Sequence, residues 1–67
     1  MDAEIGLAAG DVYRYLEAHG ASNMSQLKKG TGRKDVLLNQ AIGWLAREDK
    51  VARQADGKAV RWGIARA

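Results

Sequence analysis

Apolar side chains recur at helical spacing in two stretches of the chain. In the first, four residues fall at i, i+4, i+7 and i+11: Ile5, Ala9, Val12 and Leu16. This spacing predicts an amphipathic helix over about residues 4–19, which Gly20 would end from the C′ position. In the second, four residues fall at i, i+3, i+4 and i+7: Leu38, Ala41, Ile42 and Leu45. They predict a helix over about residues 34–48.

A shorter helix is predicted between these two. Ser25 has a side chain suited to an N-cap, and Leu27 is the main apolar residue of a helix over about residues 25–30. The segment 30–32 holds two glycines and would break this helix, because glycine adopts the positive φ of a turn at little steric cost. The extended chain before the helix has room for one very short strand at residues 23–24.

After residue 48 the apolar period changes from 3.6 to two. The alternation predicts strands over about residues 50–54 and 59–64. Asp56-Gly57 between them is a strong signal for a two-residue type I′ turn, which would pair Val51 with Trp62. In that register the apolar residues of the second strand share one face: Val60, Trp62 and Ile64.

Three helices followed by a hairpin within 67 residues are the plan of a winged helix-turn-helix domain, which belongs to the α+β class. The second and third helices would form the helix-turn-helix, and the hairpin would be the wing. We therefore expect residues 1–67 to form a single domain. The main alternative is a three-helix bundle with an unstructured tail, which gives the apolar alternation of the last strand no role.

Part of the chain resembles the signature of a known family. Residues 41–51 read A-I-G-W-L-A-R-E-D-K-V, similar to the A-L-G-W-L-A-R-E-D-K-I of small, largely uncharacterised bacterial and archaeal winged helix-turn-helix proteins. Residues 9–13 resemble the family's A-G-x-[VI]-[WY] opening, and residues 27–29 match its L-K-K. The resemblance covers nearly the whole chain and implies the winged helix fold, without an assigned enzymatic role or ligand. Residues 31–35 are more basic and richer in glycine than the family's usual acidic helix start, which favours phosphate binding.

Charge is distributed unevenly along the chain. The net charge is +3. Residues 1–27 carry four acidic residues and one basic residue, whereas residues 28–67 carry ten basic residues and four acidic ones. A basic half of this kind is typical of a nucleic-acid surface, although it also suits solubility at high pI.

The outer face of the third helix carries side chains that can read DNA bases. Asn39 and Gln40 are of the type that binds adenine N6 and N7, and Arg47 suits guanine O6 and N7. Arg33 and Lys34 precede them at the helix start, where phosphates would lie. The wing adds three basic residues that would contact the phosphate backbone: Arg53, Lys58 and Arg61. The same residues have an explanation without DNA. A helix face in solvent needs polar side chains, and basic residues on an edge strand prevent it from pairing with other strands.

The composition argues against other kinds of site. The chain has no cysteine and a single histidine, so it offers neither a thiolate metal site nor a His-rich centre. It has no Ser-His-Asp or Cys-His arrangement and no phosphate loop, so we expect no enzyme, no cofactor and no small-molecule substrate. No apolar run approaches the roughly 20 residues of a membrane span, and the start lacks a secretory signal. We therefore expect a cytoplasmic protein.

Two functions fit this sequence. The first is a non-enzymatic module that binds double-stranded DNA and serves in transcription. The second is a protein-interaction or homodimerisation module on the same scaffold, which Val36 and Gly43 on the outer helix face would equally suit. Trp44 and Trp62 can stack on bases, but we expect them in or near the core, because a small chain without phenylalanine needs its large side chains for burial.

Overall fold

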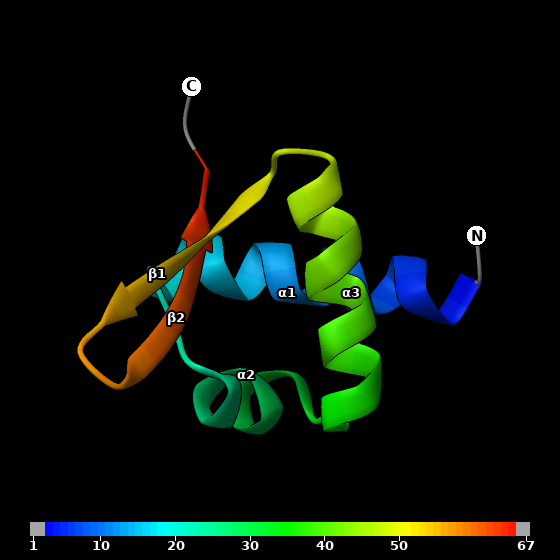
Figure 1. The fold of residues 1–67 in the computed structure, drawn as a ribbon. Coiled ribbons are helices and arrows are strands. Elements are labelled where there is room, and N and C mark those ends of the chain that lie inside the picture. The colour runs from blue at the N-terminus through cyan, green and yellow to red at the C-terminus, as the bar shows by residue number, and fades with distance from the viewer. Residues whose placement is uncertain (1–2, 66–67) are drawn as a thin grey trace.

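The computed structural model describes residues 3–65, apart from the side chain of Asp56. The elements follow in the order α1 (Ala3–His19), α2 (Met24–Thr31), α3 (Asp35–Arg47), β1 (Val51–Asp56) and β2 (Ala59–Ile64). Three helices followed by an antiparallel hairpin confirm the α+β winged helix plan. Figure 1 shows α1 crossing behind α3, α2 beside the N-terminal end of α3, and the hairpin extending from the helices on one side. No helix within residues 3–65 is long and apolar enough to cross a membrane.

The core forms where the buried stripes of α1 and α3 meet. Its buried residues are Ala8, Ala9, Val12 and Leu16 from α1, Leu27 from α2, Leu38, Ala41, Ile42 and Leu45 from α3, and Val51 from β1. Trp44 and Trp62 are half-buried and pack against this cluster, as the sequence suggested. The apolar periodicity therefore identified the packing faces of both long helices.

The start of α2 differs from the prediction. Asn23, rather than Ser25, is the N-cap, because its side-chain oxygen accepts a hydrogen bond from the backbone N–H of Gln26 at 2.8 Å. The Gln26 side chain in turn accepts from the backbone N–H of Asn23 at 2.8 Å. This reciprocal pair is a capping box and satisfies two N–H groups that a cap at Ser25 would leave without partners. The helix accordingly begins one residue earlier, at Met24.

The hairpin forms in a different register from the one predicted. Val51 pairs with Ile64, and Arg53 pairs with Trp62, so the Val51–Trp62 pairing was wrong. The two-residue turn is Gly57-Lys58, and β1 extends to Asp56 instead of ending at residue 54. Gly57 has a φ of 63°, whereas Lys58 is outside the positive-φ region. Positive φ at the first central residue alone matches a type II′ turn, which places glycine there.

The short extra strand consists of one residue. Ser22 pairs with Trp62 as an isolated bridge, in which each backbone N–H donates to the other residue's carbonyl at 2.9 Å. The bridge falls before residues 23–24, where we expected it, because Asn23 already belongs to the cap of α2. Ser22 is buried and ties β2 to the connection between α1 and α2.

The turn from α3 into the wing uses an aspartate where glycine is common. Asp49 has a φ of 58°, in the left-handed region. Its N–H donates to the carbonyl of Ala46 at 3.1 Å, and the N–H of Lys50 donates to that of Leu45 at 2.9 Å. These two bonds define a Schellman motif, with Asp49 at C′. The motif ends α3 at Arg47 and directs the chain into β1.

Candidate nucleic-acid interface

The outer face of α3 is a continuous exposed stripe. Its residues lie at i, i+4, i+7 and i+11 and are all exposed: Val36, Gln40, Gly43 and Arg47. They lie opposite the stripe that packs on α1, and Asn39 is exposed beside them. The stripe is about 16 Å long at about 1.5 Å of rise per residue, and a helix with its side chains is about 10–12 Å across, which matches the roughly 12 Å width of the DNA major groove. A helix face of this kind can lie in that groove.

Gly43 leaves the backbone bare in the middle of this stripe. A Cβ at this position would meet no heavy atom within 4 Å, so packing inside the domain does not require glycine. Its φ does not require glycine either, because Gly43 lies within a regular helix and outside the positive-φ region. Glycine in a helix interior costs about 1 kcal/mol relative to alanine. The glycine therefore lowers the stability of the fold, and it allows another surface to approach the helix backbone closely.

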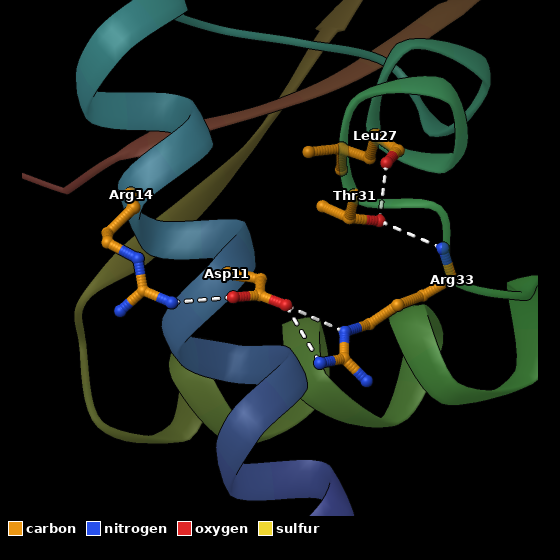
Figure 2. Close-up of polar contacts among 5 residues, drawn as sticks. All are labelled: Asp11, Arg14, Leu27, Thr31 and Arg33. Carbon is orange, nitrogen blue, oxygen red and sulfur yellow. Dashed lines mark hydrogen bonds and ion pairs between the residues drawn. The ribbon is translucent and has the colours of Figure 1, made fainter.

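The side chain of Arg33 binds to a residue of α1. Its Nε donates to Oδ2 of Asp11 at 2.8 Å, and its Nη2 lies 2.8 Å from the same oxygen. The other carboxylate oxygen of Asp11 accepts from Arg14, so one carboxylate joins two guanidinium groups (Figure 2). The side chain of Arg33 is 26% exposed. These contacts link the turn before α3 to α1, and the phosphate contact suggested for Arg33 stays a prediction.

Three further polar contacts lie where α2 meets α3. The Thr31 hydroxyl donates to the Leu27 carbonyl at 2.7 Å and accepts from the backbone N–H of Arg33 at 3.2 Å (Figure 2). Lys28 in α2 forms an ion pair with Asp35 in the first turn of α3, with an Nζ–Oδ1 distance of 2.8 Å. The helix-turn-helix is therefore held by polar contacts as well as by the core.

Both carboxylates in these contacts have lowered pKa values. The hydrogen bond from Arg33 is the largest cause at Asp11 and holds the pKa of that carboxyl below its usual value, although partial burial opposes the shift. The hydrogen bond from Lys28 lowers the pKa of Asp35 in the same way. A carboxyl with a lowered folded-state pKa stabilises the fold above its unfolded-state pKa. That stabilisation is lost as the pH falls through the folded-state pKa.

We expect Asp11→Asn to lower the free energy of unfolding by about 1–2 kcal/mol at pH 7, because Arg33 then loses its charged partner. The difference from the parent protein should shrink as the pH falls below the unfolded-state pKa of about 4 and then through the lower folded-state pKa of Asp11. Urea unfolding at pH 7 and pH 3 measures both quantities. Glu17→Gln neutralises an exposed carboxyl on the same helix and serves as the control. An equal loss for Asp11→Asn at both pH values would contradict an ionic contribution.

The wing places its basic residues on different faces. Arg53 lies directly opposite Trp62, and directly opposed residues of an antiparallel pair share a face. Arg61 pairs with Gln54 on the other face, and Lys58 lies in the turn. All three cations are exposed. A duplex that contacts one face of the wing reaches only one of the two arginines, because they lie on opposite faces.

The other predicted contacts gather on and beside α3. Lys34 is the exposed N-cap residue of α3, with extended backbone angles and no side-chain cap bond. It borders, with Val36 and Gln40, a hollow of about 490 Å³ at the start of the helix. The structure thus brings Lys34, Asn39, Gln40 and Arg47 together on one exposed surface. Sequence reasoning missed the Asp11–Arg33 ion pair, because its partners are 22 residues apart and no local pattern connects them.

Comparison with known proteins agrees with this architecture. The model of a winged helix-turn-helix domain family, DUF2582, matches residues 1–61. The uncharacterised protein MJ1608 of Methanocaldococcus jannaschii is 40% identical over 67 residues, which cover 96% of this chain and 91% of the relative. No solved structure matches the chain. The family match includes all three helices and extends into β2.

Proposed function

Because the chain belongs to the DUF2582 family of winged helix-turn-helix domains, we propose that it is a non-enzymatic module that binds double-stranded DNA. The observation that carries the proposal is the outer face of α3, where exposed Gln40 and Arg47 flank the bare backbone of Gly43. In helix-turn-helix proteins the second helix of the motif enters the major groove. A cytoplasmic location and a role in transcription belong to the same proposal.

Each side chain of this surface has a separate part in the proposed complex. Gln40 and Asn39 pair with adenine edges and Arg47 with guanine, and a good bidentate pair discriminates against a wrong base by about 1–3 kcal/mol. Lys34 contacts a phosphate at the start of α3. Arg33 acts mainly as a positioning residue, because its guanidinium holds the turn against Asp11.

The wing supplies phosphate contacts through its exposed cations. Lys58 in the turn and either Arg53 or Arg61 reach the backbone of the duplex, since the two arginines lie on opposite faces. With Lys34, this makes about three phosphate contacts. Each neutralised phosphate contributes about −0.9 to the slope of log K against log salt, so the expected slope is about −3.

Fluorescence anisotropy with a labelled random duplex across a salt series tests this function. We expect binding at micromolar protein near 50 mM salt, with the slope given above. Gly43→Ala should stabilise the fold by about 1 kcal/mol and weaken DNA binding about tenfold, because its Cβ stands between the helix backbone and the base edges.

Gly10→Ala is the matched control for this variant. It makes the same change inside α1, where the new Cβ would have the Arg14 guanidinium as its nearest neighbour, at 3.4 Å. We expect it to leave DNA binding unchanged. No binding near 50 mM salt would contradict DNA binding itself, and equal binding by both glycine variants would contradict the use of α3.

A protein-interaction module is the second candidate, and Val36 favours it. Val36 is 71% exposed on the outer face of α3, which is unusual for a large apolar residue. A second protein or another copy of this chain would bury it beside Gly43. Sedimentation at two concentrations distinguishes self-association from DNA binding alone, since a monomer at both concentrations contradicts a homodimer.

A further inference from the structure

A groove separate from the α3 outer face lies between α1 and the C-terminal half of α3. Its volume is about 460 Å³, which is within the range of small-molecule sites. α1 contributes Gly6, Gly10 and Tyr13 to its lining, and α3 contributes Trp44. None of its lining residues is among the candidate DNA contacts.

The groove has small residues on the α1 side and aromatic side chains beside them. Gly6 and Gly10 lie one turn apart, and both leave the surface of α1 without side chains. Each glycine costs the helix about 1 kcal/mol relative to alanine. Tyr13 and Trp44 are half-buried and pack against the core, so contacts with the core hold their rings in place. A flat apolar group therefore finds both room and aromatic contact here.

The charges around the groove are positive. Lys50 lines it with its ammonium group 5.9 Å from the centroid of the Trp44 ring. Arg14 also lines it, and the guanidinium lies close to Gly10. Asp11 pairs with Arg14 from outside the lining but shares its carboxylate with Arg33, so these three side chains keep a net positive charge (Figure 2). No acidic residue lines the groove within the part of the chain that the structure describes.

We propose that this groove binds a small planar aromatic carboxylate. Its ring lies against Trp44 and Tyr13 above the two glycines, and its carboxylate accepts a charge-assisted hydrogen bond from Lys50. The ring supplies apolar burial, and the anion complements the positive charge of Lys50 in the lining. This binding does not depend on the proposed DNA binding, because the two surfaces share no residue. The groove was not visible in the sequence, since its walls come from segments about 30 residues apart.

Titration of the full chain with naphthalene-2-carboxylate, followed by amide and indole chemical shifts, tests the site. We expect saturable shifts in the millimolar range or tighter, concentrated at Gly6, Gly10, Lys50 and the Trp44 indole. The neutral analogue 2-naphthalenemethanol should bind about tenfold more weakly, because it makes no ionic contact with Lys50.

Two variants and one control sharpen the result. Lys50→Gln should weaken carboxylate binding about tenfold and leave binding of the alcohol unchanged. Lys58→Gln removes an exposed lysine from the wing turn, outside the groove, and should change neither. Gly10→Leu fills the groove and should abolish binding of both probes. If that variant does not fold, Lys50→Gln still decides the question.

Three results would overturn the proposal. The first is a set of shifts that do not saturate or that spread over all basic residues, which indicates general anion binding. The second is equal affinity for the acid and the alcohol, which removes the role of Lys50. The third is a concentration-dependent dimer in sedimentation whose interface shifts include Trp44 and Gly10, because a second copy would then occupy the groove. Failure of DNA binding affects none of these readouts.

Discussion

Leu27→Ala is expected to remove most of the stability of the domain. Leu27 is fully buried, with 0% of its surface exposed, and is the buried residue of the eight-residue helix α2. Truncating a buried leucine costs about 2–5 kcal/mol, whereas a domain of this size is stable by only about 3–10 kcal/mol in total. A helix as short as α2 does not persist without tertiary packing. Circular dichroism during urea unfolding should show a strongly lowered midpoint and loss of helical signal in dilute urea.

Leu7→Ala makes the same chemical change at a residue that is 65% exposed. Its effect should be within about 0.5 kcal/mol, because most of its surface is already exposed to solvent. The two leucines therefore separate the effect of burial from that of helix propensity, which is shared. Similar unfolding midpoints for both variants would contradict the placement of Leu27 in the core.

Local patterns predicted the helices because each pattern is contained within its own element. The buried stripes of α1 and α3 follow a 3.6-residue period over several turns. If either helix packed with a different face, it would expose the four apolar residues of its stripe to solvent. Glycine-rich breaks then marked the ends of α1 and α2, and Gly20 and Gly32 do adopt positive φ. These features made the winged helix plan readable from the sequence.

The hairpin register depended on contacts outside the hairpin. A turn at Asp56-Gly57 and one at Gly57-Lys58 both use the same glycine, so turn chemistry alone did not distinguish them. The observed register places the backbone of Trp62 against Ser22, which precedes α2. Such non-local contacts leave no periodic trace in the sequence.

The sequence predicted where the candidate site lies, but it did not predict which of the basic side chains are paired with a carboxylate. An amphipathic helix exposes whatever lies opposite its buried stripe, so Gln40 and Arg47 were placed correctly on the outer face of α3. Whether a cation is available depends on distant partners. Arg33 and Lys34 are neighbours in sequence, yet Arg33 pairs with Asp11 on α1 while Lys34 is exposed at the helix start.

Gly30→Ala should destabilise the fold by about 2 kcal/mol, the second largest effect that we expect. A Cβ on Gly30 would lie 2.1–2.9 Å from three atoms of the Tyr15 ring, well inside contact distance. The ring cannot easily move away, because it packs against the core and its centroid is 4.2 Å from that of the His19 ring. The substitution therefore pushes α2 away from α1. Thermal unfolding should show a fall in Tm of about 8–16 °C.

Removing the obstructing ring should reverse the sign of this effect. In a Tyr15→Ala background, Gly30→Ala has no ring to meet and should be neutral or stabilising by up to about 1 kcal/mol, the ordinary helix preference for alanine. The four proteins of the double-mutant cycle isolate the steric term as a coupling of about 2–3 kcal/mol. Gly43→Ala in α3 is the matched control, because its Cβ enters open space and should stabilise the parent protein. If Gly30→Ala destabilises equally with and without the Tyr15 ring, the close α1–α2 contact at this point is wrong.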